Sequence, residues 1–111
     1  MKNKNSFATQ VIEIVRLIPE GRVSTYGAIA RFIGTTGSAR TVGYILGKSI
    51  EGRESPAHRV VNSVGVLSGA MAFETPTKMQ ELLESEGVII EKSKVKNFKQ
   101  LLWDPSIEMN G

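Results

Sequence analysis

The stretch TYGAIARFIGTTGSARTVGYILGK, residues 25–48, decides the fold of this chain. Thr25 is suited to be the N-cap of a helix over residues 26–33, because its hydroxyl oxygen can accept hydrogen bonds from the first free backbone N–H groups. Residues 34–38, Gly-Thr-Thr-Gly-Ser, have the composition of a turn, and a second helix is predicted from about Ala39 to Lys48. Together these features indicate a helix-turn-helix motif over residues 25–48.

The segments on either side of the motif supply the rest of a small core. Residues 6–18 carry apolar side chains at helical spacing, and Ser6 is placed to cap that helix. After the motif, the polar residues 50–55 predict a loop. Two short strands are predicted at residues 60–61 and 66–67, around a tight turn.

The C-terminal third continues this pattern. An amphipathic helix is predicted over residues 78–85, followed by a strand that begins at residue 88. We expect residues 104–111 to fray as a C-terminal tail. Three lysines would share one solvated face of the strand at period two: Lys92, Lys94 and Lys96.

Composition bounds both fold and function. The 111 residues predict a single domain, residues 1–111, of α/β class: a mostly helical, winged-helix-like domain with short strands. The chain has no cysteine and one histidine, so we expect no thiolate catalysis, no metal and no cofactor. No apolar run approaches the roughly 20 residues that span a bilayer, so we expect no membrane contact and a cytoplasmic location, on the nucleoid in a bacterium. The formal charge of +3 permits a nucleic-acid partner without requiring one.

Ala57 is the most informative single residue. It lies in the run SPAHRVVNS, residues 55–63, which resembles the active-site motif Pro-Cys-His-Arg-Val of the O6-alkylguanine-DNA alkyltransferases, with alanine at the position of the nucleophilic cysteine. Three further motifs resemble that family in the same order: IPEGRVSTYGAIA at 18–30, ARTVG at 39–43 and LLESEG at 82–87. The chain is therefore similar to the alkyltransferase-like proteins, which bind alkylated guanine in DNA and do not dealkylate it.

Small residues mark one face of the predicted helix over residues 39–48. Ala39, Gly43 and Gly47 form a smooth stripe, which suits either close helix packing or close approach to the DNA minor groove, only ~6 Å wide. The family resemblance favours the minor groove. It also implies that Arg40 replaces the flipped base in the stack and that Tyr26 drives rotation of the target nucleotide. The expected DNA contacts, including phosphate-binding N–H groups at a helix start, are Thr25, Tyr26, Gly27, Ala28, Ala39, Arg40, Thr41, Gly43, Tyr44 and Gly47.

The resemblance also implies a lesion pocket beside Ala57. Because alanine is smaller than cysteine, and smaller than the tryptophan that some relatives carry, we expect the pocket to admit bulky O6 substituents. With no thiol to activate, position 57 is vestigial and no catalytic residue is expected. His58 and Glu86 are expected to bond to each other as structural residues, and Arg59 to tie the loop to the core. The expected pocket residues are Tyr26, Pro56, Ala57, Val60, Ser68 and Met71.

Two departures from the full-length alkyltransferases bear on pocket selectivity. Ser49 stands where those enzymes have a hinge asparagine, and the loop Ser68–Met71 offers no arginine near Ala70 to probe the base. The chain also begins where the DNA-binding domain of those enzymes begins, as in the short free-standing members of the family.

The expected partners are double-stranded DNA with O6-alkylguanine and, as the family implies, damage-recognition proteins of nucleotide excision repair, with the protein acting as a monomer. Two other functions remain open on the sequence. One is an alkyltransferase domain inactivated by replacement of cysteine with Ala57. The other is a helix-turn-helix transcription regulator, which would prefer a particular base sequence and bind paired half-sites as a dimer.

Overall fold

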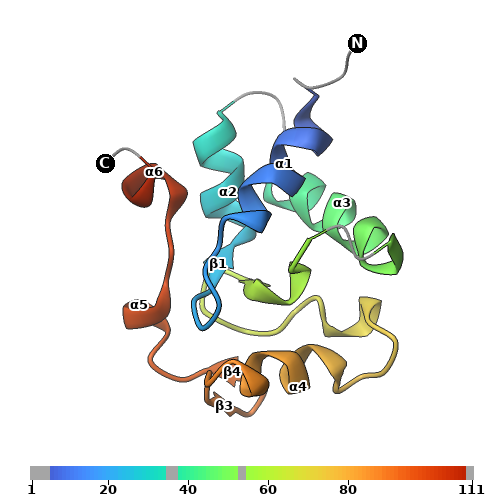
Figure 1. The fold of residues 1–111 in the computed structure, drawn as a ribbon, viewed down its shortest axis with the longest axis vertical. Coiled ribbons are helices and arrows are strands. Elements are labelled where there is room, and N and C mark those ends of the chain that lie inside the picture. The colour runs from blue at the N-terminus through green and yellow to red at the C-terminus, as the bar shows by residue number, and fades with distance from the viewer. Residues whose placement is uncertain (1–5, 35–37, 53–54, 110–111) are drawn as a thin grey trace.

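The computed structural model describes residues 6–34, 38–52 and 55–109, and within them the chain is mostly helical with short strands, as predicted (Figure 1). The α-helices are α1 (Phe7–Arg16), α2 (Tyr26–Ile33), α3 (Ala39–Gly52), α4 (Lys78–Ser85), α5 (Phe98–Leu101) and α6 (Pro105–Glu108). The single-turn 3-10 helices are η1 (Ala57–Arg59) and η2 (Ala70–Ala72). The strands are β1 (Ser24–Thr25), β2 (Val60–Val61), β3 (Ile90–Glu91) and β4 (Lys94–Val95).

The helix-turn-helix consists of α2 and α3, which pack against each other and against α1. The two predicted N-caps are confirmed: Ser6 Oγ accepts from the N–H of Thr9 at 3.1 Å, and Thr25 Oγ1 from that of Ala28 at 3.0 Å. Gly34 ends α2 in the left-handed conformation, with φ +74°. Residues 35–37 of the predicted turn lie outside the described residues.

The third helix is longer than predicted. It continues to Gly52, so the loop expected over residues 50–55 is wrong for its first three residues, and residues 53–54 lie outside the described part. Ser49 is buried, and its hydroxyl donates to the carbonyl of Leu46 at 2.9 Å, one turn earlier. Because this bond satisfies the buried hydroxyl, the polar residue does not end the helix.

A two-stranded parallel pair joins the motif to the rest of the chain. Ser24 pairs with Val60 and Thr25 with Val61, which confirms the strand predicted at residues 60–61. Neighbouring residues of a strand point to opposite faces. Val60 therefore packs with the three N-terminal helices, whereas Val61 packs with α4 and the hairpin beyond it.

Two predictions about strands are wrong. Residues 66–67 form no strand; Val66 makes only an isolated bridge to Lys94. The single strand expected from residue 88 is instead a hairpin, in which β3 pairs antiparallel with β4. Lys92 and Ser93 adopt positive φ, +52° and +62°, and form its turn, so the lysines do not share a strand face, although Lys92, Lys94 and Lys96 are all exposed.

The core has two clusters, one on each side of β2. The first lies among α1, α2 and α3 and contains Val11, Ile14, Val15, Ile18, Ile29, Ala30, Val42, Leu46, Ala57, Val60 and Trp103. The second lies between α4 and the hairpin and contains Val23, Val61, Leu67, Met79, Leu83, Val88 and Val95. Leu82, the neighbour of Leu83 on α4, is half-buried.

The C-terminal segment is anchored, so the fraying predicted over residues 104–111 is wrong for the described residues up to 109. The N–H of Trp103 donates to the carbonyl of Val23 at 2.6 Å, and the N–H of Val23 donates to that of Leu101 at 3.1 Å. Arg22 donates to the carbonyls of Leu101 and Leu102 at 2.9 and 2.7 Å. Pro105, at the start of α6, is buried.

Within the described residues, no helix is long and apolar enough to cross a membrane. The same part of the chain holds no group of three or more His, Cys, Asp or Glu side chains that could bind a metal ion.

Trp103→Ala tests the anchoring of the C-terminal segment. Trp103 is 6% exposed and belongs to the first cluster. Removing its ring should lower the free energy of unfolding by about 3–5 kcal/mol, measured by urea denaturation. Ile107→Ala is the matched control: Ile107 is 71% exposed, and its loss should change stability by less than about 0.5 kcal/mol. Equal stability of the two variants would contradict the anchoring.

Candidate DNA-binding surface and base pocket

The carboxylate of Glu86, in the turn after α4, receives hydrogen bonds from three residues in two other parts of the chain, η1 and the segment before β1. His58 Nε2 lies 2.7 Å from Glu86 Oε2, so the predicted contact between these residues is present. Arg59 donates from Nε and Nη2 at 3.0 and 2.7 Å, and the N–H of Gly21 donates at 3.3 Å. Arg59 Nη1 also donates to the carbonyl of Ile18 at 2.9 Å, which ties the loop to the end of α1.

These bonds set the protonation state of Glu86. Its side chain is 10% exposed, and burial acts to raise its pKa. The hydrogen bonds from Arg59, His58 and Gly21 outweigh burial and hold the pKa at about 2, below the usual 4.5. Glu86 is therefore an ionised structural link whose hydrogen-bonding capacity is already used near neutral pH.

A cavity of about 240 Å³ opens beside Ala57. Its lining residues come from η1, from the segment before α4 and from α4 itself: Ser55, Ala57, His58, Phe73, Glu74, Lys78 and Leu82. The sequence analysis found Ala57 but missed the contribution of α4. Lys78 and Leu82 lie at i and i+4 on one face of α4, and this face lines the cavity.

Ala57 alone among the six expected pocket residues lines this cavity. Val60 is fully buried in the first cluster because the parallel pairing of β2 turns its side chain inward. Met71 lies in η2 and is 80% exposed, and Ser68 is exposed as well. Pro56 is half-buried and precedes η1, and Tyr26 lies elsewhere, against α3 and the loop before η2.

Tyr26, the first residue of α2, lies between two glycines. A Cβ added at Gly43 of α3 would stand 3.7 Å from its ring. A Cβ added at Gly69 would stand 2.7 Å from its hydroxyl oxygen, closer than such atoms approach, so a side chain there would displace the tyrosine. Burial raises the pKa of Tyr26, while a hydrogen bond with the Ser68 side chain lowers it. Tyr26 thus connects α2, α3 and the loop at residues 68–69.

The start of α3 presents an exposed surface. Ala39, Arg40 and Thr41 are all exposed. Farther along, a Cβ added at Gly47 would meet no atom within 4 Å, so this glycine is not needed for close helix packing. Tyr44 is 67% exposed, and the ammonium of Lys48 lies 5.8 Å from its ring centroid, within cation–π range.

At the start of α2, the capping interaction already uses part of the backbone hydrogen-bonding capacity. Thr25 and Ala28 are buried, and the N–H of Ala28 already donates to the Thr25 hydroxyl. Gly27 is half-buried, and a Cβ there would stand 3.2 Å from Arg31 Nη1. Arg31 is exposed and brings a positive charge to this helix start, which the sequence analysis missed although the two residues lie at i and i+4.

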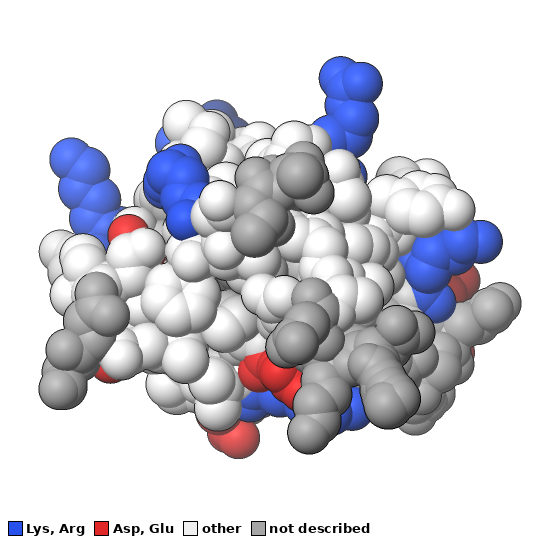
Figure 2. Space-filling view, turned by 90° about the horizontal axis from the view of Figure 1, so that it is seen from above, with Lys and Arg blue, Asp and Glu red and all other residues white. Residues whose placement is uncertain are grey.

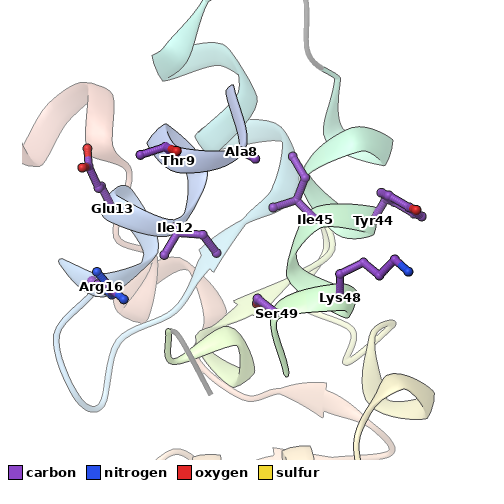
Figure 3. Close-up of a pocket in the computed structure, with 9 residues that line it drawn as sticks. All are labelled: Ala8, Thr9, Ile12, Glu13, Arg16, Tyr44, Ile45, Lys48 and Ser49. Atoms are coloured by element: carbon purple, nitrogen blue, oxygen red, sulfur yellow. The ribbon is translucent and has the colours of Figure 1, made fainter. Parts of the chain in front are cut away.

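A second, larger groove of about 490 Å³ lies between α1 and α3 (Figure 3). Ile12 of α1 and Ile45 of α3 are its apolar lining, with Glu13 and Arg16 on the α1 side and Tyr44 and Lys48 on the α3 side. It contains no residue of the run 55–63. Figure 2 shows the molecule from above, with Lys and Arg side chains standing out at the edge and acidic side chains at the lower centre and the rim.

The fold and the site define a helix-turn-helix domain with a cavity at its SPAHRV motif. Residues 6–88 match the family described as “6-O-methylguanine DNA methyltransferase, DNA binding domain”, and the chain belongs to this family. This confirms the resemblance found in the four motifs.

Named relatives and a solved structure refine this placement. The chain is 36% identical over 104 residues to the DNA base-flipping protein of Escherichia coli K12, covering 94% of this chain and 79% of that protein. It is 35% identical over 105 residues to Alkyltransferase-like protein 1 of Schizosaccharomyces pombe, covering 91% and 97%. The crystal structure of S. pombe Atl1 in complex with damaged DNA containing O6-carboxymethylguanine superposes with a TM-score of 0.79 at 36% identity, again covering 91% and 97%.

Glu86→Gln tests the ionised link. The pKa of Glu86 is lowered from 4.5 to about 2 on folding, so its contribution of about 3 kcal/mol is present above pH 4.5 and is lost as the pH falls through 2. The difference in free energy of unfolding between wild type and variant should therefore be largest near about pH 6 and shrink toward pH 2. Glu84→Gln, at an exposed site on α4, is the matched control, and urea denaturation is the measurement. A difference that does not vary with pH would contradict the role of the carboxylate.

Proposed function

We propose that this chain binds O6-alkylguanine in duplex DNA, rotates the base out through the minor groove, and holds it against Ala57 without removing the alkyl group. The observation that carries the proposal is the cavity at Ala57, at the position where the resembling enzymes have their nucleophile. The names of the similar proteins, a base-flipping protein and an alkyltransferase-like protein, support it. So does the structural similarity to Atl1 bound to damaged DNA.

The DNA contacts follow from the exposed face of α3. The helix approaches the minor groove along Ala39, Gly43 and Gly47, where the absence of long side chains lets the backbone come close. Arg40 enters the stack in place of the flipped base, since its planar group both stacks and donates hydrogen bonds. Thr41 and Tyr44 flank this path, and Tyr26 presses on the phosphate beside the target nucleotide.

At the start of α2, fewer residues can contact phosphates than the sequence suggests. Thr25 and Ala28 shape the helix start from inside, because they are buried and bonded to each other. The N–H groups of Tyr26 and Gly27 and the guanidinium of Arg31 are then the groups that meet the backbone. These contacts position the protein without reading base sequence.

Energetics favour the damaged base. Flipping costs a few kcal/mol of unstacking and unpairing, and least at a weakened pair, which an O6-alkyl group creates. Apolar contact in the cavity then adds about 25 cal/mol per Å² of alkyl surface removed from water. Ala57, Phe73 and Leu82 provide that contact.

No chemical step follows binding. The chain has no cysteine, and His58 is bonded to Glu86 beside the methyl group of Ala57, so it has no nucleophile to activate. The complex therefore persists. We propose that the monomeric protein acts in the cytoplasm, on nucleoid DNA in a bacterium, and that the persistent complex marks the lesion for damage-recognition proteins of nucleotide excision repair.

Arg40→Ala tests lesion recognition. Wild type should bind a duplex with one O6-methylguanine more tightly than the matched guanine duplex, by roughly 1–3 kcal/mol, and the variant should lose much of that difference. Fluorescence anisotropy measures both affinities. Lys99→Ala, which removes an exposed cation on α5, is the control and should retain the difference. Equal binding of the two duplexes by wild type would leave a general DNA-binding domain, and loss of the methyl group from the recovered duplex would reveal transfer chemistry.

Gly47→Ala separates DNA approach from helix packing. Because a Cβ at this position meets no atom within 4 Å, the substitution should leave the fold intact and stabilise it by up to about 1 kcal/mol through helix propensity. The same methyl group would stand between α3 and the groove, so affinity for the lesion duplex should fall. Thermal unfolding and anisotropy on one preparation give both quantities. An unchanged affinity would place Gly47 outside the DNA contact.

A further inference from the structure

Tyr44 and Lys48 form a pair on the surface of α3. The ammonium of Lys48 lies 5.8 Å from the centroid of the Tyr44 ring, close enough for the cation to be attracted to the face of the ring. Both side chains are exposed, and Tyr44 keeps 67% of its surface open to solvent. The pair therefore presents an aromatic ring and a positive charge together at the surface.

The pair points away from α1, as Figure 3 shows. Ile45, the next residue along the chain, points instead toward Ile12 of α1 and lines the groove between the two helices. The apolar side of α3 is thus used inside the protein, whereas most of the Tyr44 ring remains in solvent. Burial of this ring by another molecule would be favourable, because it removes apolar surface from water.

This pair lies on the part of α3 that the proposed function places against DNA. Arg40, Tyr44 and Lys48 are spaced at i, i+4 and i+8, so they form one row along the helix, beside the stripe of small residues. At 1.5 Å per residue, Tyr44 lies about 6 Å along the axis from Arg40, which is less than two nucleotide steps of about 3.4 Å. The ring therefore faces the nucleotides next to the flipped base, and not the base itself.

A DNA strand at the edge of the minor groove offers a partner for each half of the pair. Its deoxyribose rings provide apolar surface for the tyrosine ring, and its phosphates provide negative charge for the ammonium. Because Lys48 is already held over the ring, it loses less side-chain freedom on meeting a phosphate than an unrestrained lysine would lose.

We propose that Tyr44 and Lys48 bind the DNA strand next to the flipped nucleotide as one unit. The ring of Tyr44 packs against a deoxyribose at the edge of the minor groove, and Lys48 holds the adjacent phosphate. Because neither residue touches the altered base, the unit adds affinity for DNA without adding preference for the lesion. The inference rests on the proposed function and deepens it: the four family motifs contain neither residue, and Lys48 was not among the expected DNA contacts.

Binding of a guanine duplex and of an O6-methylguanine duplex at several salt concentrations tests the phosphate contact. Lys48→Gln removes one such contact, so the slope of log K against the logarithm of salt concentration should become shallower by about 0.9. Both duplexes should be weakened by the same factor, roughly threefold to tenfold near physiological salt, so the ratio of their affinities should not change. Fluorescence anisotropy gives the affinities.

Variants of Tyr44 test whether the two residues act together. Tyr44→Phe keeps the ring and should bind like wild type, whereas Tyr44→Ala should weaken both duplexes. When Tyr44→Ala is combined with Lys48→Gln, the total loss should be smaller than the product of the two single losses, because Lys48 is no longer held in place. Both side chains are exposed, so thermal unfolding should show that all of these variants fold.

Lys92→Gln is the matched control. It removes the same charge from the turn of the β3–β4 hairpin, at the bottom of Figure 1 and away from α3, and should leave the slope unchanged. An unchanged slope in Lys48→Gln, an equal change in Lys92→Gln, or independent losses in the double variant would overturn the inference. So would a change in the ratio of the two duplexes, because that result places the pair against the lesion.

Failure of this inference and failure of the proposed function give different results. Equal binding of the two duplexes by wild type refutes the proposed function. The slope and the coupling between Tyr44 and Lys48 are measured on each duplex separately, so their absence refutes this inference even where the lesion is preferred.

Discussion

The carboxylate of Glu86 is the interaction on which the rest of the site depends. It accepts hydrogen bonds from His58 and Arg59 of η1 and from the backbone of Gly21, just before β1, while Arg59 also reaches the end of α1 at Ile18. Removing the Glu86 carboxylate would leave the nearly buried guanidinium of Arg59 without its ion pair, which is strongly destabilising in proteins. One side chain therefore fixes η1 against two other segments, and with η1 it fixes the position of Ala57.

This arrangement gives the His58–Glu86 pair a role under the proposed function, in which the chain binds without a transfer step. In a transfer enzyme a base beside a thiol would activate it, but the His58–Glu86 pair has a structural use that needs no thiol. Without a nucleophile at position 57, binding energy gained in the cavity is not followed by a covalent step. Under the proposed function, the lifetime of the complex is then set by dissociation, which suits the marking of a lesion.

Local signals predicted local structure well, and long-range pairing explains most of the errors. The caps at Ser6 and Thr25 and the full extent of α4 followed from side-chain chemistry and periodicity. The parallel pairing of β2 with β1 joins segments that are far apart in the sequence, and it has no local signature. The cavity walls were missed for a related reason: residues 68–77 lack periodicity, so only the structure shows that Phe73, and Lys78 beyond it, line the same cavity as Ala57.

Small residues define the proposed site, and each is small for a different physical reason. Gly69 leaves room for the hydroxyl of Tyr26, Gly43 borders the ring of the same tyrosine, and Gly47 borders open space. In a helix interior each glycine costs about 1 kcal/mol relative to alanine. At Gly69 an added side chain would collide with the Tyr26 hydroxyl, whereas at Gly47 it would meet no atom of the described residues. No internal contact explains the glycine at position 47. Close approach of another molecule to this surface would explain it, and the DNA minor groove is narrow enough to require a residue without a side chain.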